Sequence, residues 1–171
     1  MSGAQALIRK RLADEGAKSA AFFRGLTPEQ FAQQVYTTGP QWRVRDVLAH
    51  FVSAERTFIY YGRDILQGGG GAPDDFVIDE FNLTQMAEYL EANTDQLIAQ
   101  FEAARADTLA FVDRLSDADL QRVGRHPWFG RVPIEYMSKL IYRHNMLHER
   151  DVRRALEARQ PVPHVDAQPQ A

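Results

Sequence analysis

Two histidines one helical turn apart are the residues of this sequence most suited to chemistry. His144 and His148 lie in the segment LIYRHNMLHERDVRRAL, whose apolar spacing predicts a helix. At about 100° per residue, the two imidazoles lie roughly 40° apart on the helix surface. Apolar residues flank them on the same face: Met137, Leu140, Ile141, Val152 and Ala155. The pair should therefore face the protein interior, where it can hold one metal ion.

Two imidazoles are too few to hold a transition metal firmly, so a third ligand is expected from a facing helix. His50, in the segment WRVRDVLAHF, lies toward one edge of a predicted apolar helix face and is the natural candidate. His126 lies in a predicted loop and His164 in the C-terminal tail, so substituting either should leave metal occupancy unchanged. Any one of the three histidines alone could be an ordinary hydrogen-bonded core residue. Three together without a metal would each need a polar partner, since an unpaired buried polar group costs about 1–3 kcal/mol.

The elements that must position these histidines are predicted to be helices. Apolar residues at helical spacing indicate helices over 4–26, 43–66, 79–115 and 134–158. A short helical piece is expected to start at Thr27 and Pro28, a glycine-rich break spans 67–75, and residues 122–133 are expected to form a loop. No segment is typical of a strand. The sequence thus predicts an all-α four-helix bundle over residues 1–158, with a disordered, proline-rich tail over 159–171.

Composition narrows the classes of protein to consider. The chain has 171 residues, which suggests one domain, and its net charge of -3 argues against non-specific nucleic-acid binding. It has no cysteine, which excludes disulfides, thiolate metal ligands and a cysteine nucleophile. No stretch approaches the roughly 20 apolar residues of a membrane span, and the N-terminus lacks the apolar core of a signal peptide. We therefore expect a cytoplasmic protein that binds neither membranes nor nucleic acid.

The segment WRVRDVLAHF, followed much later by HNMLH, resembles the DinB-like superfamily, which includes mycothiol-dependent maleylpyruvate isomerase N-terminal domains and bacillithiol-transferase-like proteins. The resemblance extends from the first helix to about Leu156, and includes an Asp-x-x-Asn at Asp79 and Asn82. It implies an up-down-down-up four-helix bundle with a divalent metal held by His50, His144 and His148. One departure is Arg43, which stands after Trp42 where the family usually has Thr or Ser as a helix cap.

Three histidines leave at least one coordination position open, as in catalytic zinc sites. The uncompensated charge of the cation can then lower the pKa of a bound water or thiol toward about 7. The resemblance implies activation of a low-molecular-weight thiol for transfer to, or isomerisation of, a small molecule. Hydrolysis is the other reaction that the same ligands allow. Zinc or nickel is the expected ion, with iron or manganese as alternatives.

Other residues are candidates for supporting roles. Glu55 and Asp151 could serve as a base or proton shuttle, or instead be surface charges or orient a histidine. Asn82 is a candidate for contact with a cofactor. Tyr61 and Tyr142 could line a cavity, although aromatic residues on helices are more often part of the core.

Two alternatives to an enzyme stay open, and so does the state of assembly. One alternative is a bundle that binds a small molecule without catalysis, and the other is a stress-related interaction protein whose site has decayed. A homodimer is expected, because large apolar side chains could exceed what one core can hide; light scattering can test this. The apolar side chains on which this expectation depends are Phe22, Phe58, Ile59, Phe76 and Phe81.

Overall fold

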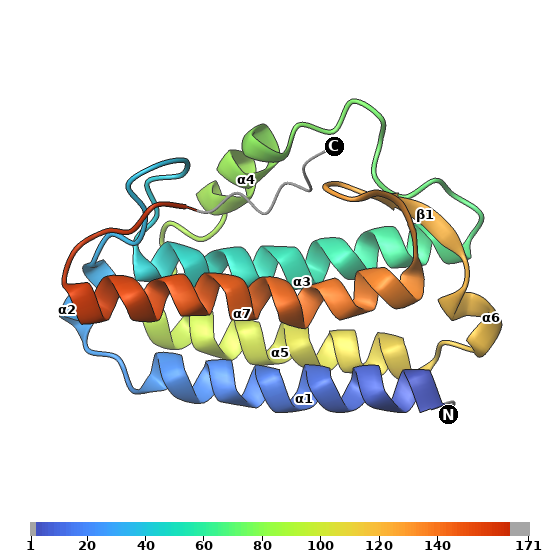
Figure 1. Cartoon of the computed structure of the whole chain (residues 1–171), viewed down its shortest axis with the longest axis horizontal. Helices are drawn as coiled ribbons and strands as arrows, with labels where there is room; N and C mark the ends of the chain where they lie inside the picture. The colour runs from blue at the N-terminus through green and yellow to red at the C-terminus, as the bar shows by residue number, and fades with distance from the viewer. Residues whose placement is uncertain (1–2, 165–171) are drawn as a thin grey trace.

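Four long helices form the body of the protein in a computed structural model, which describes residues 3–164 (Figure 1). They are α1 (Gly3–Arg24), α3 (Val44–Leu66), α5 (Thr94–Asp113) and α7 (Ile134–Ala158). Helices α1 and α7 run in one direction and α3 and α5 in the other. Helix α3 packs against α5 and α7, and α1 packs against the same two helices. The predicted four-helix bundle with up-down-down-up order is confirmed.

Because α3 and α5 run in the same direction, the chain must travel back along the bundle between them. Residues 67–93 make this return outside the bundle and carry α4 (Ile78–Ala87), which packs on α3 (Figure 1). The prediction of one helix over 79–115 is therefore wrong. The chain turns after α4, and Asn93 then caps α5 by accepting a hydrogen bond from the amide of Gln96 at 2.9 Å. The guanidinium of Arg45 stabilises this turn by donating to the carbonyls of Tyr89 and Ala92, at 3.0 and 2.8 Å.

The predicted loop over 122–133 is a β-hairpin. It follows α6 (Asp117–Leu120) and consists of β1 (Val123–His126) and β2 (Gly130–Pro133), which pair in antiparallel register. The outer edge of β1 binds the glycine-rich break: the amide of Arg125 donates to the carbonyl of Gly70 at 2.7 Å, and the amide of Ala72 donates to that of Arg125 at 2.9 Å. Strands of four residues are too short for alternation to show in a sequence, so the loop prediction failed.

The helix starts near the histidines follow the sequence more closely. Thr27 caps α2 (Pro28–Ala32) by accepting a hydrogen bond from the amide of Gln30 at 3.3 Å, as predicted. Arg43, at the start of α3, has no cap side chain of its own. Its backbone amide is instead bound by the carboxylate of Asp46 at 2.9 Å, so the departure from Thr or Ser leaves the helix start intact.

The expected disordered tail begins with an ordered segment. Residues 160–164, here called the C-terminal strap, turn back and lie beside residues 35–38, with a parallel bridge between Tyr36 and Val162. The remaining tail residues, 165–171, lie outside the described residues. Within residues 3–164, no helix is both long and apolar enough to cross a membrane.

Two of the apolar residues on which the dimer expectation depends are hidden within the chain. Phe58 and Ile59 are only 8% and 7% exposed and belong to a core cluster between the helices. The large hydrophobic side chains most open to solvent are Leu83 on α4 at 77%, Tyr60 on α3 at 70% and Leu90 after α4 at 63% exposure.

A buried ion pair ties three of the four long helices together. Arg105 of α5 donates from Nε to Glu55 of α3 at 2.8 Å and from Nη1 to the carbonyl of Leu12 in α1 at 2.6 Å. The second carboxylate oxygen of Glu55 accepts from the Thr108 hydroxyl at 2.5 Å. The side chains of Arg105 and Glu55 are 6% and 0% exposed. Each charge thus depends on the other, because removing one leaves its partner buried and unpaired.

Replacing Arg105 by Ala should therefore lower the free energy of unfolding by about 3–5 kcal/mol, as measured by denaturant titration. The control is Arg24→Ala, which removes the ion pair between Arg24 and Glu102. The side chains of these two residues are 54% and 44% exposed. This control should cost less than about 1 kcal/mol, since exposed pairs contribute little. Equal losses in the two variants would contradict the role given to the buried pair.

Candidate metal centre

Helices α3 and α7 bring the three predicted ligands together. The Nε2 atom of His144 lies 2.9 Å from Nε2 of His50 and 3.1 Å from Nε2 of His148. The three residues form a group whose ligand atoms all lie within 4.8 Å of one another. His144 and His148 are one turn apart on α7, and His50 faces them from α3 because the two helices pack side by side.

All three imidazoles are held in the neutral form. Burial lowers the pKa of His144 to about 4, and it lowers the pKa values of His50 and His148 well below the usual value of 6.5. The close approach of the rings adds to this, because a charge on His144 would repel a charge on either of the other two. Neutral imidazole is the form that binds a metal ion.

Two side chains orient the rings from outside the group. Nδ1 of His144 lies 3.2 Å from Oδ1 of Asn145. Since an amide oxygen only accepts, this nitrogen carries the hydrogen and Nε2 presents its lone pair to the other two histidines. Nδ1 of His148 lies 2.5 Å from the hydroxyl of Tyr36. When that nitrogen donates to the tyrosine oxygen, the Nε2 lone pair of His148 also points inward.

Aromatic rings enclose the group. The ring of Trp42 lies 4.6 Å from that of His50, and the ring of Phe51 lies 6.2 and 6.3 Å from those of His144 and His148. Tyr36 is fully buried, and burial raises the pKa of its hydroxyl, an effect strengthened by the charge of Asp151. The rings thus sit in an apolar surrounding that opposes charge on any of them.

This arrangement fits a metal ion. Three Nε2 atoms converge on one point, and the nitrogens of a tetrahedral zinc site are separated by roughly 3.3 Å, given Zn–N bonds of about 2.0–2.1 Å. The two short separations differ from that value by only a few tenths of an ångström. Without a cation, one of these Nε2 atoms must carry a hydrogen and donate it to another, and the single Nε2 lone pair of His144 can accept only one of its two close neighbours. Nδ1 of His50, the nitrogen outside these contacts, is buried and has no hydrogen-bond partner within the described residues.

The other candidates lie in different surroundings. The carboxylate of Glu55 is bound to Arg105 and Thr108 of α5, so its hydrogen-bonding capacity is directed away from α7. Asp151 is buried, and it pairs with Arg150 at 3.2 Å and with Arg154 at 3.7 Å. Asn82 is half-buried on α4 and does not belong to the histidine group.

The two remaining histidines differ from each other. Nδ1 of His126 accepts hydrogen bonds from the amides of Trp128 and Phe129, at 3.1 and 3.3 Å, so His126 holds the hairpin turn. His164 lies beside the centre instead: its ring is 5.8 Å from that of His148 and 4.5 Å from that of Tyr36.

Sequence reasoning missed Tyr36, Asn145 and His164. Asn145 directly follows a predicted ligand on the apolar side of its helix, which is a detectable signal for an orienting residue. Tyr36 and His164 carried no such signal, because both lie in irregular segments whose pairing only the fold reveals.

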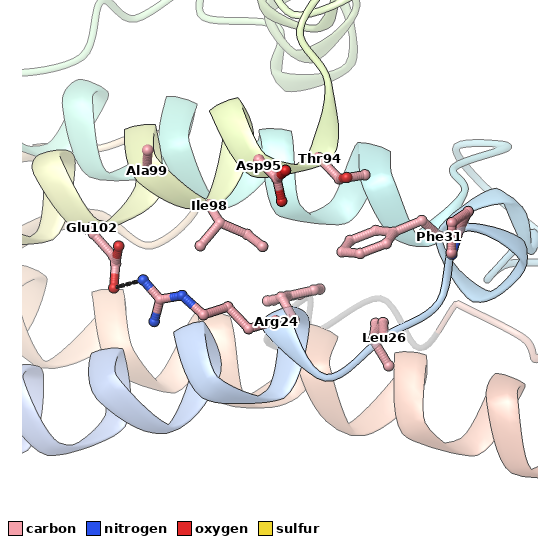
Figure 2. A pocket seen from close by; sticks show the side chains of 10 residues that line it. Arg24, Leu26, Phe31, Thr94, Asp95, Ile98, Ala99 and Glu102 are labelled. Atoms are coloured by element: carbon pink, nitrogen blue, oxygen red, sulfur yellow. Dashed lines mark ion pairs between the residues drawn. The ribbon is translucent and has the colours of Figure 1, made fainter.

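One groove in the surface lies away from the histidines. This groove of about 550 Å³ lies between the end of α1, α2 and the start of α5 (Figure 2). Phe23, Leu26, Phe31 and Ile98 form its apolar wall, and the ion pair of Arg24 with Glu102 crosses one end. None of the three ligand histidines lines it.

Comparison with known proteins identifies the family and the fold. A model of the DinB superfamily matches residues 11–152, while no curated protein sequence matches significantly. The structure of the mycothiol-dependent maleylpyruvate isomerase has a TM-score of 0.73 at 13% identity, over 89% of this chain and 63% of that one. YfiT from Bacillus subtilis, a probable metal-dependent hydrolase with an unusual four-helix bundle topology, has a TM-score of 0.74 at 16% identity, over 94% and 91%.

A third structure, the sibling lethal factor precursor DfsB, has a TM-score of 0.73 at 14% identity. The match covers 95% of this chain and 100% of that one. At such identities the solved structures show a shared fold, and this chain spans only 63% of the length of the isomerase. The family match extends from within α1 to within α7 and includes all three ligand histidines. The chain belongs to the DinB superfamily.

Proposed function

We propose that this chain is a metal-dependent enzyme that binds one divalent transition-metal ion through His50, His144 and His148. The observation that carries the proposal is the convergence of three neutral imidazole nitrogens at 2.9 and 3.1 Å. A bound ion of this kind supplies a positive charge that makes a thiol or a water molecule acidic enough to react near neutral pH. The resemblance to an isomerase and to a probable hydrolase supports chemistry on a small molecule.

The chain's own residues divide the remaining work. Three protein ligands leave a coordination position for a small molecule, and the aromatic rings of Trp42 and Phe51 limit the water around it. Tyr36 and Asn145 hold His148 and His144 in the tautomers that bind metal. Glu55 is committed to the buried ion pair, so we assign it a structural role. Asp151 acts on Tyr36 through its charge and does not touch the ligands in any hydrogen bond of the described residues.

Zinc or nickel is the ion that we expect in purified protein. Imidazole suits both, and availability decides between them. The activated group is a low-molecular-weight thiol for transfer or isomerisation, or a water molecule for hydrolysis. The absence of cysteine in the sequence means that any thiol in the reaction comes from outside the chain.

Substituting any one ligand histidine should abolish stoichiometric metal binding. His144→Ala is the sharpest test, because His144 lies between the other two, and it should weaken zinc binding by at least about 100-fold. Elemental analysis after reconstitution and dialysis measures this. His126→Ala is the matched control and should retain one ion per chain. Full metal content in His144→Ala, or no uptake of zinc, nickel, manganese or iron by the unaltered protein, would exclude the site.

Metal binding should persist to unusually low pH. The folded imidazoles take up protons only well below 6.5, about pH 4 for His144, so protons compete weakly with the metal above that range. We expect zinc to be retained at pH 6 and released as the pH falls toward 4. The metal-free protein should lose stability over the same interval, because the unfolded chain binds protons from about pH 6.5 downward while the folded chain does not. Zinc content and thermal unfolding, each followed against pH, check both statements.

The reaction class can be tested with separate substrates. Zinc- or nickel-loaded protein is incubated with mycothiol or bacillithiol and an electrophile such as monobromobimane, and separately with an activated ester. We expect one reaction to be accelerated at least about tenfold over the metal-free protein, a barrier change of about 1.4 kcal/mol. His144→Ala should lose this acceleration. Metal-loaded protein that binds these compounds but accelerates neither reaction would point to a non-catalytic binding protein.

A further inference from the structure

The C-terminal strap is built into the fold. The amide of Val162 donates to the carbonyl of Val35 at 2.8 Å, and the amide of Thr37 donates to the carbonyl of Val162 at 2.9 Å. The side chain of Val162 is only 8% exposed and belongs to the same core cluster as Tyr36. The amide of His164 donates to the hydroxyl of Thr38 at 3.2 Å. These contacts hold the strap along its length.

The sequence of the strap favours this course. Pro161 and Pro163 flank Val162 and restrict the unfolded chain, so ordering the segment loses less entropy. Arg159, which ends α7, has a φ of 51°, in the left-handed region that non-glycine residues rarely adopt. Such a conformation persists only where surrounding contacts impose it. The chain is thus turned back toward residues 35–38 by a specific local geometry.

The strap places His164 against a hydrogen bond that orients a ligand. Its ring stacks on that of His148 at 5.8 Å and 28°, and meets that of Tyr36 edge-on at 4.5 Å and 88°. The Tyr36 hydroxyl and Nδ1 of His148 form the 2.5 Å hydrogen bond described above. His164 therefore packs on both partners of that bond.

The loop after Tyr36 also approaches the ring of His164. An added Cβ at Gly39 would stand 3.6 Å from Nδ1 of His164. The ring thus occupies a defined place between the loop after Tyr36 and the ligand His148.

We propose that the C-terminal strap supports the metal centre and that its residue His164 is a positioning residue for His148. It acts by the packing of its ring, which keeps Tyr36 and His148 in their hydrogen-bonded arrangement and slows release of the ion. The proposal rests on the metal binding proposed above. The sequence predicts that substituting His164 leaves metal occupancy unchanged, and we still expect full occupancy of His164→Ala in excess zinc. The difference is that His164→Ala should release the bound zinc faster.

The test follows zinc release from the loaded, full-length protein into excess chelator. His164→Ala should release zinc about tenfold faster or more, in the range found when residues that orient metal ligands are removed. His164→Phe, which keeps a planar ring but has no nitrogen, should release zinc at nearly the unaltered rate. A chain that ends at Arg159 lacks the strap and should behave like His164→Ala. A chain that ends at Asp166 keeps the strap and serves as its control.

A second readout separates positioning from general stability. Cobalt(II) in place of zinc reports the ligand geometry through its visible absorption bands. These bands should change in His164→Ala and return in His164→Phe, while thermal unfolding of the metal-free forms stays the same.

The possible results lead to different conclusions. Unchanged zinc release in His164→Ala would overturn the proposal and leave the three-histidine site intact. Release from His164→Phe as fast as from His164→Ala would also overturn it, because the imidazole nitrogen rather than ring packing would then matter. If the unaltered protein takes up no zinc at all, the proposed function falls together with this inference.

Discussion

The side-by-side packing of α3 and α7 is the constraint on which the centre depends. His50 is on α3, and His144 and His148 are on α7, so their nitrogens lie together only if the two helices keep the same relative position and orientation. Interdigitated apolar side chains supply that precision, since a packed core resists displacement. Phe51 follows His50 on α3 and contacts both histidines of α7, so the same ring that fills the core also sets the distance across the site. The packing of the core between α3 and α7 therefore also fixes the geometry of the histidine group.

The neutrality of the imidazoles is a second consequence of their place in the bundle. A histidine in water changes charge near the pH of the cell, whereas these three are kept neutral by burial and by one another. Nδ1 of His144 and Nδ1 of His148 are met by Asn145 and Tyr36, whereas Nδ1 of His50 has no partner within the described residues. These two residues come from α7 itself and from the segment before α3, so the orientation of the ligands depends on more than the helices that carry them.

Much of the fold, and the grouping of His50, His144 and His148, could be predicted from the sequence. Local patterns can be recognised in a single sequence. The apolar spacing in α1, α3 and α7 is such a pattern, and so is the interval between His144 and His148. The prediction failed where structure depends on contacts between distant segments. The break between α4 and α5 is stabilised by Arg45 from α3, the hairpin by Gly70 and Ala72, and the strap by residues 35–38. No periodicity marks such partners, and the apolar spacing that continues from α4 into α5 concealed the turn between them.

The distribution of polar contacts has a consequence for how the bundle comes apart. Arg105 joins α1, α3 and α5 through the buried pair, and Gln5 further joins α1 to α5 through the carbonyl of Val112 at 2.8 Å. Helix α7 takes part in neither of these bonds; its polar contacts with the other elements include Ser19 to Glu149 at 2.6 Å and Tyr36 to His148 at 2.5 Å. Local unfolding of the bundle should therefore begin with separation of α7 from the other three long helices. An ion bound by histidines of both α3 and α7 would oppose this separation.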